Sequence, residues 1–285
     1  MVPTLGAIAP RAPALVPVPG AEVLAVEGGL VRYQSTGSGS EAVLFLHGFN
    51  SQLSIWSDVW PHVTACGRSV RIDIPGYGGS TWPAASYALP DQAARVMTFI
   101  DALGLTRVTL VGVSMGGSLA AWLAAHYPTR IKGLVLVAPS GYPGSLQYKG
   151  PFGHLLGNGL VSRAATWVAD TSAYRWLYPD SRALHALTVT ASYGDAWARA
   201  LASIRVHTWL VWSRGDATVP FANAEAVARA IPVHTLIPLA AHVGHDLPAK
   251  RVALIGELAC RVHRGESPEV IQRALDASLQ HNGDR

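Results

Sequence analysis

The stretch Gly112-Val113-Ser114-Met115-Gly116 decides the expected fold of this chain of 285 residues. An apolar run at 108–111 precedes it and an alanine-rich stretch at 117–125 follows it, which is the order of a strand, a sharp turn and a helix. Glycine two residues before and after the serine leaves room where strand and helix fold back on each other. The turn is therefore expected to present the Ser114 hydroxyl at the edge of a sheet, beside the free N–H groups of the helix N-terminus.

Strand-like and helix-like patterns alternate along most of the chain. Strand patterns occur at 22–26, 30–34, 42–46, 69–74, 108–111, 131–138, 208–212 and 233–239. Helix patterns occur at 55–65, 89–103, 117–125, 221–231, 248–263 and 268–279. The first two strands flank Gly28-Gly29 and are expected to form an antiparallel hairpin. The alternation predicts an α/β fold with a mostly parallel central sheet flanked by helices.

Three segments stand outside this alternation. Residues 142–204 contain no strand-like run but several short helical patterns rich in aromatic residues, which predicts a helical cap over the core. Residues 1–20 are rich in proline and alanine and are expected to form a flexible arm, and residues 265–285 a C-terminal helix and tail. The core would then comprise residues 21–141 and 205–264.

Composition excludes several classes of protein. The net charge of +4 comes from scattered arginines without a basic cluster, so no nucleic-acid partner is expected. No apolar run approaches the roughly 20 residues that would span a bilayer.

Cys66 and Cys260 have no CxxC spacing and are predicted to be buried free thiols. The N-terminus lacks a basic stretch followed by a clean hydrophobic segment, so a cytoplasmic location is expected, although export to the periplasm stays open.

Five stretches, in this order along the chain, resemble those of the α/β-hydrolase superfamily. They are Leu46-His47-Gly48-Phe49, Asp73-Ile74-Pro75-Gly76-Tyr77-Gly78-Gly79-Ser80, the turn at Ser114, Trp212-Ser213-Arg214-Gly215-Asp216, and Ala241-His242. The resemblance runs from about residue 22 to residue 263. It implies the α/β-hydrolase fold, in the carboxylesterase-like branch that has a serine nucleophile and a helical cap inserted after strand 6.

The resemblance implies a catalytic triad of Ser114, Asp216 and His242. A serine hydroxyl needs a base to accept its proton as it attacks, and an imidazole suits that task near neutral pH. A carboxylate then fixes the tautomer of the imidazole. Asp216 follows the strand at 208–212 and His242 follows the strand at 233–239, which is where relatives carry their acid and base.

Alternatives exist for the base and for the acid. His245 could be the base if the loop were longer, and Ala241 stands where the family usually has glycine before its histidine. The alternative acid position after the sixth strand holds Ser140, which cannot serve, and Asp246 is too close to His242 in sequence. The two histidines could also bind a metal, but no third ligand accompanies them, so neither a metal nor a cofactor is expected.

The resemblance also implies where an oxyanion and a substrate would bind. The oxyanion-hole donors would be the backbone N–H groups of Phe49 and Met115, while His47 would brace the first of these loops. Asn50 and Trp56 could line the acyl side of the pocket. The expected pocket residues of the cap are Tyr142, Phe152, Trp167 and Trp176.

These features favour hydrolysis of a small carboxylic ester with apolar or aromatic groups, through an acyl-enzyme. Serine at the nucleophile position argues against the dehalogenase and epoxide-hydrolase members, which attack through an aspartate. Carbon–carbon bond hydrolysis, acyl transfer, and slow or non-catalytic ligand binding remain alternatives on the same fold. The C-terminal helix could contact a second subunit, which leaves a homodimer open.

Overall fold

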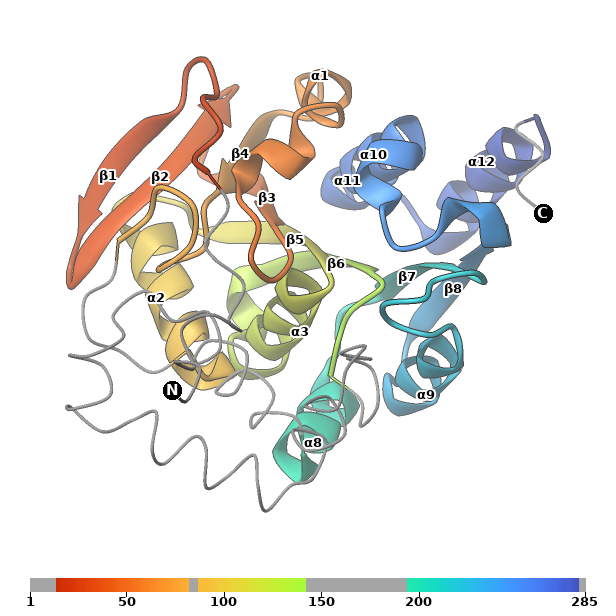
Figure 1. Cartoon of the computed structure of the whole chain (residues 1–285). Helices are drawn as coiled ribbons and strands as arrows, with labels where there is room; N and C mark the ends of the chain where they lie inside the picture. Colours follow the sequence, from red (N-terminus) through yellow and green to blue (C-terminus); the bar gives the residue numbers. More distant parts are fainter. Residues whose placement is uncertain (1–13, 82–86, 142–193, 282–285) are drawn as a thin grey trace, which may run out of the picture.

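A computed structural model describes residues 14–81, 87–141 and 194–281 (Figure 1). The eight described strands form one sheet in the order β1-β2-β4-β3-β5-β6-β7-β8. Their bounds are β1 Glu22–Val26, β2 Gly29–Thr36, β3 Glu41–Leu46, β4 Arg68–Ile72, β5 Arg107–Val113, β6 Ile131–Val137, β7 Thr208–Ser213 and β8 His234–Leu239. Strand β1 pairs with β2, and β2 with β4, in antiparallel fashion, whereas all the other pairs are parallel. The α/β fold and the mostly parallel sheet are therefore confirmed.

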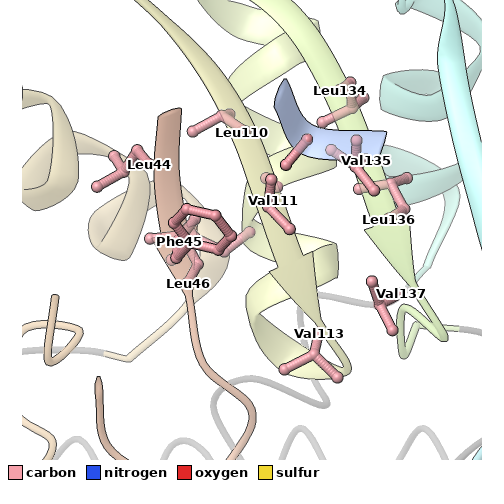
Figure 2. Close-up of a cluster of buried hydrophobic side chains, with 14 of the residues drawn as sticks. Leu44, Phe45, Leu46, Leu110, Val111, Val113, Leu134, Val135, Leu136 and Val137 are labelled. Atoms are coloured by element: carbon pink, nitrogen blue, oxygen red, sulfur yellow. The ribbon is translucent and has the colours of Figure 1, made fainter. Parts of the chain in front are cut away.

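Helices cover both faces of this sheet (Figure 1). Those described are α1 Trp60–Val63, α2 Leu89–Ala102, α3 Met115–His126, α8 Asp195–Ser203, α9 Ala222–Ala230, α10 Leu247–Lys250, α11 Val252–Arg264 and α12 Pro268–His281. Helices α2, α3 and α8 lie on one side, and α1, α11 and α12 lie on the other. Because both faces are covered, the central strands are continuous apolar runs, as Figure 2 shows for β3, β5 and β6.

Two of the predicted helices are each divided in the structure. The pattern at 55–65 forms a short 3-10 helix at Leu53–Trp56 and then α1, which has Pro61 in its first turn. Proline has no N–H to donate to the preceding turn, so the helix restarts there. The pattern at 248–263 is divided between α10 and α11 by Arg251, whose φ of −133° is not helical.

The prediction of two free thiols is wrong, because Cys66 and Cys260 form a disulfide. Their Cα atoms lie 4.9 Å apart, within the range that a bridge requires. The bridge joins the segment between α1 and β4 to helix α11. Disulfides are typical of oxidising compartments, whereas the sequence alone predicted a cytoplasmic location. Within the described part of the chain, no helix combines the length and apolar character needed to cross a membrane.

The expected cap lies largely outside the described residues. Tyr142, Phe152, Trp167 and Trp176 all fall in the segment that the structure does not describe. Helix α8, at the end of this segment, packs against α3 and buries Trp197.

Candidate active site

The turn between β5 and α3 holds Ser114 in an unusual backbone conformation. Its φ is 54° and its ψ is −120°, a region that non-glycine residues rarely adopt and that marks functional sites. The backbone around it is held by neighbouring strands: the Ser114 N–H donates to the carbonyl of Val137 at 2.9 Å. Ser114 is 8% exposed, so the nucleophile candidate is buried at this edge of the sheet.

The two glycines of this turn are required by close backbone contacts. A Cβ atom on Gly112 would overlap the carbonyl of Gly116. A Cβ atom on Gly116 would overlap the carbonyls of Leu46 and His47, at the end of β3. The first clash matches the expected role of the glycines between strand and helix. The second shows that the turn is also packed against the loop that follows β3.

A buried acid and a histidine are in hydrogen-bond contact at the same edge of the sheet. The Oδ2 atom of Asp216 lies 2.6 Å from Nδ1 of His245. The carboxylate follows β7 and the imidazole follows β8. The Asp216 side chain is fully buried and that of His245 is 25% exposed, so a buried acid holds a partly exposed imidazole.

The other carboxylate oxygen of Asp216 is held by the backbone. Its Oδ1 atom accepts hydrogen bonds from the N–H groups of Thr218 at 2.9 Å and Val219 at 2.8 Å. Only Oδ2 is left to accept the Nδ1–H of His245. This contact fixes the imidazole tautomer, because a proton on Nδ1 leaves Nε2 of a neutral ring as a proton acceptor.

The prediction that His242 pairs with Asp216 is therefore wrong, and His245 takes that place. Residues Ala241–Val243 form a 3-10 turn directly after β8. His242 is exposed on this turn, where its Nε2 atom lies 3.2 Å from Nη2 of Arg251.

The path of the loop explains which histidine reaches the acid. Gly244 has a φ of 66°, which turns the chain back toward β7. The hydroxyl of Ser213, the last residue of β7, accepts the Gly244 N–H at 3.0 Å and donates to the carbonyl of Ala240 at 2.9 Å. The sequence contained a signal for this result, because Gly244 is the glycine that the family resemblance leads one to expect before the base.

The loop after β3, residues 47–53, lies against the nucleophile. A Cβ atom on Gly48 would lie 3.4 Å from Cβ of Ser114. His47 is fully buried, and its Nε2 atom accepts the Ile74 N–H at 3.0 Å while its Nδ1–H donates to the Gly48 carbonyl at 2.7 Å. The C=O and N–H of one peptide unit point in opposite directions. The imidazole therefore turns the N–H of Phe49 away from itself.

The two pocket candidates on this loop have different surroundings. Asn50 is half-buried and has a φ of 51°, the left-handed region in which asparagine is tolerated better than most residues. Trp56 is fully buried in the core, where its ring centroid lies 5.2 Å from that of Phe45. The indole of Trp56 therefore belongs to the hydrophobic core beside β3, and its place in the pocket stays a prediction.

Asp73 supports the end of this loop. This fully buried carboxylate accepts the N–H groups of Leu53 at 2.5 Å and Gly79 at 2.7 Å. It also pairs with Nη1 of Arg32 at 3.2 Å. Arg71 is a second cation close to Asp73, and burial lowers its pKa to about 10.

Among the residues that the structure describes, no group of three or more His, Cys, Asp or Glu side chains could hold a metal ion.

The arrangement at this edge of the sheet consists of a strained serine, a fixed imidazole and a buried carboxylate. The three groups follow β5, β8 and β7 and occur along the chain as serine, acid and histidine. This is the chain order of one known class of serine hydrolase.

Comparison with known proteins identifies the family to which this fold belongs. The family described as alpha/beta hydrolase fold matches residues 41–159, which include β3, the loop after it and Ser114. The chain belongs to the α/β-hydrolase superfamily. This α/β-hydrolase resembles the solved structure of the enol-lactonase from Burkholderia xenovorans, with a TM-score of 0.66 and 20% identity. That likeness covers 85% of this chain and 99% of the enol-lactonase, and it shows the fold alone.

Two curated relatives of this α/β-hydrolase have enzyme names. It is 30% identical over 240 residues to the dihydrolipoyllysine-residue acetyltransferase component of an acetoin cleaving system from Cupriavidus necator, over 77% of this chain and 63% of the relative. It is 39% identical over 118 residues to a monoacylglycerol lipase from Xenopus laevis, over 39% of this chain and 35% of the relative. The chain thus spans less than two thirds of the length of either relative.

Proposed function

We propose that this α/β-hydrolase is a serine carboxylesterase that cleaves small esters with apolar or aromatic groups through an acyl-enzyme. Ser114 is the nucleophile, His245 the general base and Asp216 the acid that orients it. The observation that carries the proposal is the 2.6 Å contact of Asp216 with His245, at the sheet edge that also holds the strained Ser114 turn.

In this mechanism the Ser114 Oγ attacks the ester carbonyl carbon while its proton passes to Nε2 of His245. The carbonyl oxygen becomes an oxyanion, which the backbone N–H groups of Phe49 and Met115 stabilise. Collapse of this intermediate breaks the ester C–O bond, and the alcohol leaves with the proton from Nε2. A water molecule then attacks the acyl-enzyme with the same base and releases the carboxylic acid.

The buried carboxylate contributes by stabilising the protonated imidazole of each intermediate. Asp216 can do this because both of its oxygens already have donors, so the carboxylate does not need to move as the positive charge develops. The position of His47 supports the role of Phe49, since its bond to the Gly48 carbonyl fixes the peptide unit that carries the Phe49 N–H.

Two of the curated relatives support a reaction of acyl groups. One relative is named as an acetyltransferase component and the other as a monoacylglycerol lipase, and both names describe reactions of acyl groups. The preference for apolar or aromatic esters rests on the aromatic composition of residues 142–193. The expected partner is therefore a small-molecule ester.

The proposal is tested with initial rates on p-nitrophenyl esters whose acyl groups run from acetyl to long-chain and aromatic. Ser114→Ala is expected to abolish hydrolysis, and His245→Ala to lower kcat by at least about 10⁴-fold. His242→Ala is the matched control, because it removes the same side chain from the same loop, and it should retain activity. A folded wild-type protein that hydrolyses none of these esters would contradict the esterase proposal, and loss of activity in His242→Ala alone would contradict the choice of base.

A further inference from the structure

The chain segment before β1 is bound to the loop that carries the Phe49 N–H. We call residues 14–19 the N-terminal strap and residues 47–53 the oxyanion loop. The Val16 N–H donates to Oε1 of Gln52 at 2.8 Å, and Nε2 of Gln52 donates to the Ala14 carbonyl at 2.8 Å. The Gln52 side chain thus binds the strap at both ends of its amide, and the residue is only 4% exposed.

A second buried side chain joins the strap to the support of the same loop. Nη2 of Arg32 donates to the Val16 carbonyl at 2.8 Å, while Nη1 of the same guanidinium contacts Asp73 at 3.2 Å. Asp73 in turn accepts the Leu53 N–H, at the end of the oxyanion loop. Both polar groups of the Val16 backbone are therefore used, and both lead to the oxyanion loop.

The side chains of the strap do not explain its place. Leu15 is 54% exposed and Val16 is 45% exposed, so the segment buries little apolar surface. Hydrogen bonds instead join its backbone to two buried polar side chains, Gln52 of the oxyanion loop and Arg32 of β2. Such bonds to otherwise buried groups are costly to lose, because the amide of Gln52 and the Nη2 group of Arg32 would lose these partners.

The oxyanion loop needs this kind of support. Asn50 lies between Phe49 and Gln52 and has a left-handed backbone, a conformation that persists only where the surroundings determine it. The loop is fixed at one end by His47, through Ile74, and at the other end by Asp73, through Leu53. Between these two fixed points, the side chain of Gln52 connects the loop to the N-terminal strap.

We propose that the N-terminal strap positions the oxyanion loop through Gln52, so that the Phe49 N–H is aimed at the developing oxyanion. This inference rests on the proposed function, since it assigns a role in that reaction. Gln52 is a positioning residue that acts through the loop backbone. Loosening the strap should then weaken binding of the transition state more than binding of the substrate.

The test removes one N–H group at a distance from the loop. Val16→Pro deletes the donor to Gln52, and Val16→Ala is the matched control that shortens the same exposed side chain but keeps the N–H. Gln52→Leu removes both bonds from the other partner, and Gln52→Glu keeps only the acceptor for Val16. The readouts are kcat and KM for an ester and the inhibition constant of a trifluoromethyl ketone, which forms a tetrahedral oxyanion on the serine.

Val16→Pro and Gln52→Leu are expected to lower kcat about 10-fold with KM within about twofold, a smaller effect than the 10²–10³-fold loss of a complete donor. Affinity for the trifluoromethyl ketone should fall in parallel, Gln52→Glu should be intermediate, and Val16→Ala should stay within about twofold of wild type. All rates are measured well below the unfolding temperature of each variant. An unchanged kcat in Val16→Pro and Gln52→Leu would overturn the proposal, as would a rise in KM with kcat preserved.

Amide hydrogen exchange separates this inference from the esterase proposal. Peptides that cover residues 47–53 should exchange faster in Val16→Pro than in Val16→Ala, whether or not the wild-type protein cleaves the esters tested. Equal exchange in the two variants would overturn the proposed role of the strap, whatever the outcome for the esterase proposal. Absence of esterase activity in the wild type, with faster exchange in Val16→Pro, would instead place the failure in the proposed reaction.

Discussion

Replacing Asp216 by asparagine should reverse the proton position on His245 without disturbing the fold. The Oδ1 atom faces two N–H donors, those of Thr218 and Val219, so the new side chain must keep its carbonyl oxygen there. Its NH₂ group then takes the position of Oδ2, 2.6 Å from Nδ1 of His245. An NH₂ group can only donate, so Nδ1 must become the acceptor and the imidazole proton moves to Nε2.

This tautomer cannot accept the proton of Ser114. The corresponding substitution in a well-studied triad lowers kcat by about 10⁴-fold, or about 5.4 kcal/mol of transition-state stabilisation. We therefore expect a similar loss in kcat for Asp216→Asn on a p-nitrophenyl ester at pH 7.5, with the unfolding temperature little changed. Asp246→Asn is the matched control, because Asp246 is exposed beside His245, and it should stay within about twofold of wild type. A loss below about 10-fold in Asp216→Asn, or an equal loss in both variants, would refute the assignment.

Three other predictions follow from the packing. Cys66→Ser should lower the free energy of unfolding by up to about 5 kcal/mol, because the bridge joins residues 194 positions apart in the chain. A thiol titration of the unfolded, unreduced wild-type protein should find no free thiol, and two free thiols would contradict the bridge. Burial, with the nearby Lys132, lowers the pKa of His263 below 6.5, so the folded state binds fewer protons than the unfolded state and the free energy of unfolding should fall as pH drops from 7.5 to 5. His263→Gln should reduce this pH dependence of the free energy of unfolding, measured by denaturant titration at each pH. An unchanged pH dependence would show that it does not come from His263. Gly48→Ala should fold and lower kcat about 10-fold, because its methyl group would lie in van der Waals contact with Cβ of Ser114, at 3.4 Å, and take up space beside the nucleophile. An unchanged kcat would argue that the reacting carbonyl does not bind there.

Much of the fold could be predicted from local patterns. The hairpin of β1 and β2, the continuous apolar strands and the turn at Ser114 each follow from a few neighbouring residues, and all are present in the structure. The helix divisions at Pro61 and Arg251 were missed because apolar spacing continues across them. A periodic pattern reports which face is buried, and it does not report where the backbone leaves the helix.

The sequence by itself determined the order of strands and helices, the α/β class and the placement of Ser114 and Asp216 directly after their strands. These features depend on side-chain periodicity and on glycines that neighbouring backbone requires. Only the tertiary structure decided that His245, and not His242, meets Asp216, because Gly244 and the Ser213 hydroxyl set the path of that loop. The same holds for the disulfide and for the contact of Gln52 with the strap, since their partners are 194 and 36 residues apart and no local pattern brings them together.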